Sequence, residues 1–182
     1  MILREWRKFK GWAVLEAFLL DGRRTYLKEL SRTLAISPRT AQTYLKLYEM
    51  EGVLEKEKIG NTIVYTLESN AITKELKKTY LLLRIAPYIK RFLSDNPQIV
   101  SLALYGSAAR GEYDVHSDID LLAISASRAV GLSEINRLEK ELGMEVRLEI
   151  VSVGEWRRLA AKKDSFYSSV TNSSITLHGA LP

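Results

Sequence analysis

Two aspartates separated by one residue, Asp118 and Asp120, are the residues whose type and spacing most clearly predict chemistry. They stand where a polar loop runs into the apolar stretch LLAI, so we expect a β-strand to begin there. Side chains alternate along a strand, so both carboxylates project from one face, with Cα atoms roughly 6.5 to 7 Å apart. Like charges this close repel each other unless a cation neutralises them. The pair therefore predicts a site for Mg²⁺ or Mn²⁺.

A glycine-serine turn precedes the pair. The stretch Ile99–Tyr105 (IVSLALY) predicts a buried strand, and Gly106 and Ser107 follow it directly. Glycine permits a close backbone approach, and Ser107 offers a hydroxyl and free N–H groups at a helix start, which suits phosphate oxygens. We therefore expect a nucleoside triphosphate on this turn and the metal on the carboxylates.

The segment GSAARGEYDVHSDIDLL, residues 106–122, resembles the GS-x-x-RG…SD-x-DL signature of the minimal nucleotidyltransferases of the polymerase-β superfamily. The resemblance extends over roughly residues 97–160. It implies a small mixed α/β domain that transfers a nucleoside monophosphate from an NTP, with ATP the expected one, to an acceptor and releases pyrophosphate. It also implies that Asp118 and Asp120 are catalytic metal ligands, Gly106 and Ser107 the phosphate-contacting turn, and Arg110 the motif arginine that binds nucleotide.

The same superfamily usually adds a third acidic residue from a later strand. The expected strand, Met144–Val153, places Glu145, Arg147 and Glu149 on one face. The position of the family's acid corresponds to Arg147. Our interpretation is that Glu149 substitutes as the third catalytic carboxylate; Glu145 or a degenerate site are the alternatives. If Arg147 itself faces the site, it could bind a nucleotide phosphate or neutralise an aspartate.

The elements of the first half have a different pattern. Helical spacing of apolar residues predicts a helix over Glu5–Leu20, stopped at Asp21–Gly22, and a second around residues 26–34. Ser37 and Pro38 suit the start of a third helix that ends at Met50. A hairpin follows, with strands at residues 53–58 and 62–67 around a Gly60-Asn61 turn.

Three helices and a hairpin in this order, residues 5–68, resemble the winged helix-turn-helix family of DNA-binding domains. The resemblance implies that the third helix enters the major groove of double-stranded DNA and that the hairpin contacts the backbone. The groove-facing candidates are Ser37, Arg39, Thr40, Gln42, Thr43 and Lys46, and the hairpin candidates are Lys56, Lys58 and Asn61. A protein-docking role for the same fold is the alternative.

Composition and charge agree with two joined modules. Of 182 residues, 46% are hydrophobic and 27% charged, which excludes wholesale disorder, and the absence of cysteine excludes disulfides and thiolate metal sites. Residues 1–96 hold 18 Lys/Arg against 11 Asp/Glu, a net charge of +7, and residues 97–182 hold 9 against 11, a net charge of −2. This asymmetry favours a polyanion-binding first half.

We therefore expect a mixed α+β chain with a winged helix-turn-helix at residues 1–68, a helical connector at 69–96 and a nucleotidyltransferase-like domain at 97–182. Pro87 predicts a kink or break in the connector, which could pack within the chain or make a homodimer. No apolar run is long enough for a membrane span, and we expect a cytoplasmic protein. The expected function is Mg²⁺-dependent nucleotidyl transfer. The alternatives are a DNA-binding regulator whose transferase domain is degenerate or only senses nucleotide, and one component of a pair with a separately encoded partner protein.

Overall fold

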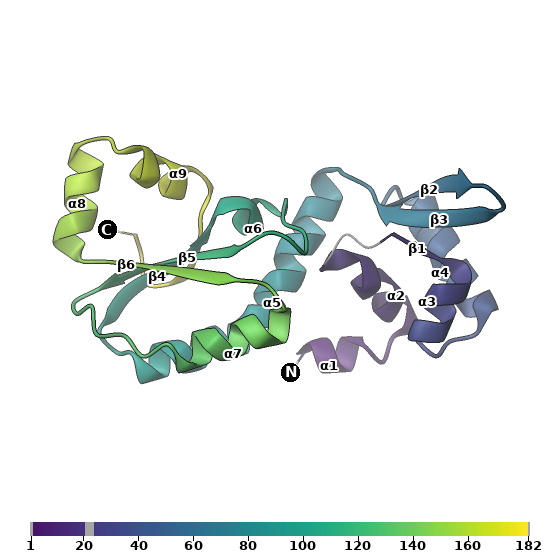
Figure 1. The fold of residues 1–182 in the computed structure, drawn as a ribbon, viewed down its shortest axis with the longest axis horizontal. Helices are drawn as coiled ribbons and strands as arrows, with labels where there is room; N and C mark the ends of the chain where they lie inside the picture. The colour runs from purple at the N-terminus through teal and green to yellow at the C-terminus, as the bar shows by residue number, and fades with distance from the viewer. Residues whose placement is uncertain (1, 21–23, 182) are drawn as a thin grey trace. The chain divides into compact units, whose positions relative to one another are not determined.

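The computed structural model describes residues 2–20 and 24–181, and the chain divides into two compact units, residues 1–83 and 84–182 (Figure 1). The expected helix stop at Asp21–Gly22 lies outside the described residues. Each unit has its own sheet and its own buried core. The two units are therefore described one at a time.

The first unit opens with two helices where we expected one: α1 (Ile2–Trp6) and α2 (Lys10–Leu19). The chain turns between them, and the N–H of Phe9 donates to the carbonyl of Trp6 at 2.9 Å. This turn brings Trp6 edge-on to Trp12, with ring centroids 4.7 Å apart. The single helix expected over residues 5–20 is wrong because aromatic packing between the two segments stabilises the turn.

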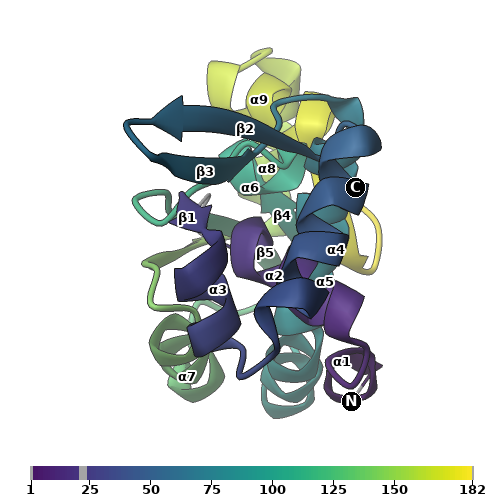
Figure 2. The same cartoon turned by 90° about the vertical axis from the view of Figure 1, so that its right-hand side faces the viewer.

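The next helices follow the local signals of the sequence. Helix α3 covers Leu27–Thr33 and α4 covers Pro38–Met50. Ser37 Oγ accepts the N–H of Thr40 at 3.1 Å, and Pro38 occupies the first helical position, so the expected start of α4 is confirmed. Helix α4 contacts α2, α3 and β2 (Figure 2).

A three-stranded antiparallel sheet completes this unit. Strands β2 (Leu54–Ile59) and β3 (Thr62–Leu67) form the expected hairpin, with Ile59 opposite Thr62 across the Gly60-Asn61 turn. A two-residue strand that the sequence did not predict, β1 (Thr25–Tyr26), pairs with β3, which gives the order β1-β3-β2. Phe18, Leu45 and Tyr65 join helices and sheet in one buried core.

Helix α5 (Ala71–Asp95) contributes to both units and runs through Pro87 without a break. Of the kink or break that the sequence predicted at Pro87, the break is therefore wrong. Proline removes one backbone donor from a helix, but Ile85 and Ile89 on either side of it are buried, and their packing holds the helical path.

The second unit is built on a four-stranded mixed sheet. Its strands are β4 (Ile99–Tyr105), β5 (Ile119–Ser125), β6 (Val146–Val151) and β7 (Ile175–His178), in the order β6-β5-β4-β7. Strands β5 and β6 are parallel, whereas β4 is antiparallel to both β5 and β7. This arrangement agrees with the expected mixed α+β class.

Helices cover both faces of this sheet (Figure 1). Helices α8 (Val153–Ala161) and α9 (Ser165–Ser173) pack Trp156 and Val170 against Leu122 and Ile124 of β5. Helix α7 (Ser133–Leu142), which the sequence analysis did not anticipate, lies on the opposite face with the end of α5, where Arg84 donates to the carbonyl of Glu141 at 2.9 Å. The short helix α6 (Gly106–Arg110) follows β4 directly.

Candidate functional site

A row of polar side chains crosses three strands of the second sheet at one end. Tyr105 at the end of β4 is the Cα partner of Asp120 on β5, and Asp120 is in turn the partner of Arg147 on β6. Asp118 comes two residues before Asp120, so it projects from the same face. Paired residues of neighbouring strands share a face of the sheet, so the row gathers these four side chains in one place.

The turn after β4 lies directly against the aspartate pair. Gly106 has φ +72°, and a Cβ at this position would lie 2.3 Å from Asp120 Oδ2. A side chain there would force the Asp120 carboxylate to move, and the positive φ is strained for residues other than glycine. The structure thus brings the expected phosphate-binding turn and the expected metal ligands together, and it supplies a second reason for glycine at residue 106.

Arg147 occupies the site in the way that one of our alternatives described. Its Nη1 atom lies 2.7 Å from Asp118 Oδ2, and its Nε donates to Glu145 Oε1 at 3.0 Å. The Arg147 side chain is 58% exposed and that of Asp118 28% exposed, so solvent or a ligand can reach both groups. The guanidinium therefore neutralises part of the charge of the pair.

Burial and charge shift the protonation of two groups in the row. Burial raises the pKa of the Asp120 carboxyl, the neighbouring Asp118 charge raises it further, and Arg147 opposes both effects. Burial also raises the pKa of the Tyr105 hydroxyl, and the charges of Asp120 and Glu149 add to this effect. Burial is the larger cause in both groups, and the neighbouring carboxylates add to it.

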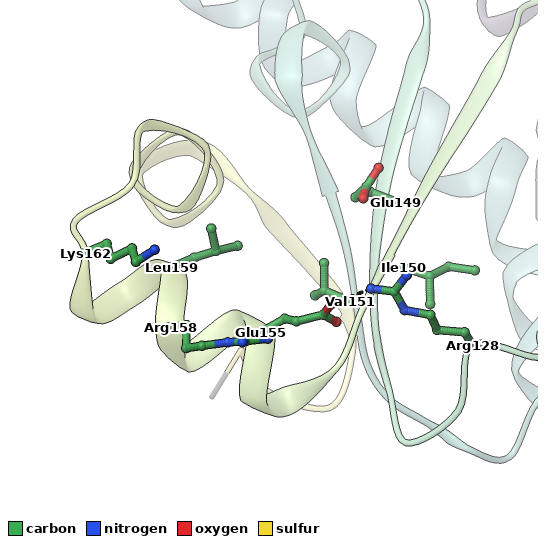
Figure 3. Close-up of a pocket in the computed structure, with 8 residues that line it drawn as sticks. All are labelled: Arg128, Glu149, Ile150, Val151, Glu155, Arg158, Leu159 and Lys162. Atoms are coloured by element: carbon green, nitrogen blue, oxygen red, sulfur yellow. Dashed lines mark hydrogen bonds and ion pairs between the residues drawn. The ribbon is translucent and has the colours of Figure 1, made fainter.

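Glu149 lies on the same strand as Arg147 but lines a separate pocket. This pocket has a volume of about 350 Å³ and lies between β6 and α8. Figure 3 shows Lys162 extending from the end of α8 toward Leu159, and Arg128 reaching Glu155, with which it forms an ion pair. Within residues 2–20 and 24–181, no three His, Cys, Asp or Glu side chains are grouped so that they could hold a metal ion. The structure therefore does not join Glu149 or Glu145 to the aspartate pair as a three-carboxylate site.

The remaining residues of the nucleotide-binding prediction belong to α6. Ser107 is half-buried, and its carbonyl accepts the N–H of Glu112 at 2.9 Å. Arg110 is exposed, and its Nε donates to Glu112 Oε2 at 2.7 Å. Ser107 thus remains part of the turn beside the aspartates. Arg110 is instead paired with Glu112, two residues further along the chain.

The candidates for DNA contact divide into two groups. Ser37, Thr40 and Thr43 use their hydroxyls within α4: the hydroxyls of Ser37 and Thr40 are 2.8 Å apart, and Thr43 donates to the carbonyl of Arg39. The side chains of Arg39, Gln42, Lys46 and Lys58 are exposed, and none of them has a side-chain partner among the described residues. Lys56 pairs with Glu49 at 2.6 Å. Gln42 and Asn61 line one pocket of about 390 Å³, so helix and hairpin share a surface.

Sequence reasoning missed Tyr105 as a part of the site. Its apolar neighbours made it look like a core residue, and its ring does pack edge-on against Phe166 at 5.7 Å. A signal was present, however, because Tyr105 immediately precedes the glycine-serine turn. A residue in that position must lie at the end of the strand that carries the turn.

Comparisons with known proteins agree with this geometry. Residues 86–171, which lie within the second unit, match the family model described as Nucleotidyltransferase domain. The chain is 29% identical over 133 residues to the bifunctional uridylyltransferase/uridylyl-removing enzyme of Legionella pneumophila strain Corby, and likewise to that of strain Lens. The match covers 69% of this chain and 15% of the length of those relatives.

Two solved structures are also similar. One is a toxin-antitoxin structure with AMP-PNP, at 22% identity and a TM-score of 0.39, covering 52% of this chain and 73% of that one. The other is a candidate nucleotidyltransferase from Sulfolobus solfataricus, at 20% identity and a TM-score of 0.35, covering 50% and 83%. With TM-scores below 0.5, neither likeness bears on function. In the part of the chain that the structure describes, no helix is both long and apolar enough to cross a membrane.

Proposed function

We propose that this chain transfers a nucleoside monophosphate from an NTP, ATP being the expected donor, to an acceptor hydroxyl. The observation that carries the proposal is the close approach of the turn to the pair: Asp120 Oδ2 lies 2.3 Å from the position that a Cβ of Gly106 would take. Carboxylates next to a glycine-serine turn at a helix start combine a cation site with a phosphate site. The match of residues 86–171 to the nucleotidyltransferase model supports the same chemistry.

The donor set of the site fits a hard divalent cation. Asp118 and Asp120 offer carboxylate oxygens on one face, and the Asp118 side chain is 28% exposed. Mg²⁺ is commonly held by one or two carboxylates together with substrate phosphates. A bound ion would neutralise charge on the phosphate oxygens during transfer.

The chain's own residues would bind and orient the two substrates. The turn at Gly106 and Ser107 holds the triphosphate, so that an acceptor hydroxyl can approach the α-phosphorus in line. The acceptor oxygen forms the new bond to phosphorus, the bond from that phosphorus to the oxygen bridging to the β-phosphate breaks, and pyrophosphate leaves with the electron pair. Glu149 is our candidate to accept the proton that the hydroxyl loses.

The pocket beside Glu149 is our candidate for the acceptor. It adjoins the strand that carries Arg147, and Glu149 stands about 7 Å further along that strand. Arg158 and Lys162, one turn apart on α8, also line it, and neither has a carboxylate partner among the described residues. Arg158 and Lys162 could bind an anionic group of the acceptor, while the acceptor hydroxyl lies near Glu149 on the other side of the pocket.

The assay for the proposal uses the full chain with Mg²⁺, each α-³²P-labelled NTP, and protein, RNA and small-molecule fractions as acceptors. We expect the wild-type chain to label one acceptor class. Asp118→Ala should lower the rate at least about 100-fold, because loss of a metal ligand removes several kcal/mol of transition-state stabilisation.

Asp95→Ala is the matched control, because Asp95 is exposed and precedes the opposite end of β4. It should retain full activity. If the wild-type chain labels nothing and also fails to bind a fluorescent ATP analogue with Mg²⁺, the transferase proposal is wrong.

We also propose that the first unit binds double-stranded DNA as a winged helix-turn-helix. The exposed Arg39, Gln42 and Lys46 on α4 and the hairpin beside them support this role. A second candidate function for the whole chain is a DNA-binding regulator whose transferase unit only senses nucleotide. Arg147 favours it, because an arginine stands where the family has an acid. Nucleotide binding without labelling of any acceptor would be its signature.

A further inference from the structure

We propose that Arg147 supplies, as a fixed cation, the positive charge that a second metal ion would bring, so that the site holds one divalent ion with its NTP. This inference rests on the proposed function and specifies its metal stoichiometry. Arg147 and Asp120 are paired on neighbouring parallel strands, and Arg147 Nη1 lies 2.7 Å from Asp118 Oδ2. The guanidinium thus contacts the carboxylate pair from β6, the strand on which we expected the third catalytic acid.

The charge balance of the site favours the binding of one divalent cation. The charges of Asp118, Asp120 and Glu145, which is bonded to Arg147, sum with that of the Arg147 guanidinium to −2, and a single Mg²⁺ brings these protein groups to 0. A second ion would repel the first and the Arg147 guanidinium, and beyond the shared Asp118 and Asp120 it would find only phosphate oxygens and no further carboxylate as ligands. No third acid of the described residues is grouped with this pair. Glu145 bonds Arg147 Nε at 3.0 Å, which holds the guanidinium at the site.

Arginine is suited to this role for two reasons. Its guanidinium does not lose its charge at physiological pH, and its planar fork of donors matches phosphate oxygens as well as carboxylates. Arg147 is 58% exposed, so its Nη2 can reach a triphosphate while Nη1 stays with Asp118 and Nε with Glu145. Nucleotide and metal would then share the site with a permanent protein cation.

The test counts Mn²⁺ ions bound per full-length chain, by electron paramagnetic resonance and calorimetry, with saturating AMP-CPP, which is not hydrolysed at its α–β bridge. We expect one Mn²⁺ for the wild-type chain and two for Arg147→Asp, which restores a third carboxylate. Arg147→Gln should keep one Mn²⁺ but bind AMP-CPP about tenfold more weakly, because it loses a charged hydrogen bond.

The matched control is Arg157→Asp, which makes the same charge change at an exposed position of α8 that does not line the pocket. It should bind one Mn²⁺. Two ions in the wild-type chain, or unchanged AMP-CPP affinity in Arg147→Gln, would overturn the inference and leave the transferase proposal intact. One ion in a folded Arg147→Asp would also overturn it. If no variant binds Mn²⁺ or AMP-CPP, both proposals fail together.

Discussion

Asp120 holds its charge in an unfavourable place. Burial and the Asp118 charge raise the pKa of its carboxyl above the ordinary 3.8. The folded state therefore binds this proton more tightly than the unfolded state does. The free energy of unfolding consequently falls as the pH rises through the window from 3.8 to the raised pKa. At neutral pH this destabilisation is fully present. The unfavourable charge is the feature that a bound cation would relieve.

Asp120→Asn should therefore stabilise the metal-free protein at pH 7. We expect the unfolding temperature in EDTA to rise by about 1 to 3 °C, a modest gain because solvent screens a half-buried carboxyl. The gain should shrink as the pH falls through the raised pKa of Asp120, because the wild-type carboxyl then becomes protonated itself. Differential scanning fluorimetry across this pH range measures both effects, and Asp95→Asn should show neither. A lower unfolding temperature at pH 7 would contradict the charge argument.

The sequence predicted which residues belong to this site better than it predicted which of them contact one another. The Asp118/Asp120 spacing and the Gly106-Ser107 turn are local patterns, and the structure places them together as expected. The ion pair between Arg147 and Asp118 depends on the register of two strands that are far apart in the chain. Strand register is set by packing of the whole sheet, so the sequence could offer this pairing only as one of several alternatives.

At the scale of elements, local signals again predicted well and tertiary effects did not. The Ser37 cap and Pro38 fixed the start of α4, and the Gly60-Asn61 pair fixed the hairpin. The run of α5 through Pro87 and the turn between α1 and α2 depend on burial and aromatic contacts between distant segments. The presence of a proline or of an apolar stripe in the sequence does not by itself predict which residues of other segments will pack against it.

Helix α8 offers a test of the acceptor pocket. Arg158→Glu with Lys162→Glu reverses the charge on the side of the pocket opposite β6. We expect KM for the acceptor found by labelling to rise at least about tenfold, because each lost charged contact weakens binding. The KM for the NTP should not change, because the turn at Gly106 lies apart from α8. Steady-state kinetics with each substrate varied in turn separates these effects.

Lys140→Glu on α7 with Arg157→Glu on α8, two exposed positions that do not line the pocket, is the matched control and should leave both KM values unchanged. An acceptor KM unaffected by the α8 variant would mean that the acceptor binds elsewhere. An equal rise in both KM values would instead point to a general change in the unit, and circular dichroism would then show altered folding.

On the scale of the whole molecule, the chain joins two units with different charge. The first 96 residues carry a net charge of +7, and the remaining 86 carry −2. The basic first part attracts polyanions at long range, whereas the remaining 86 residues hold negative charge partly in the aspartate pair, which needs cations to meet a triphosphate. The two binding activities that we propose should therefore be separable by substitution.

Arg39→Ala with Lys46→Ala tests this separation in the full chain. Both residues are exposed on α4 and have no side-chain partner among the described residues, so their loss should not disturb folding. If each contacts one phosphate, the slope of log K against log salt should fall by about 2, and affinity for a DNA duplex should drop at least tenfold at low salt. Fluorescence anisotropy over a salt series measures both quantities, with Lys140→Ala as a control that should match the wild-type chain. Binding of an ATP analogue should stay the same in every variant. Unchanged DNA affinity and slope would exclude α4 from the groove and leave a protein-docking role for the first unit.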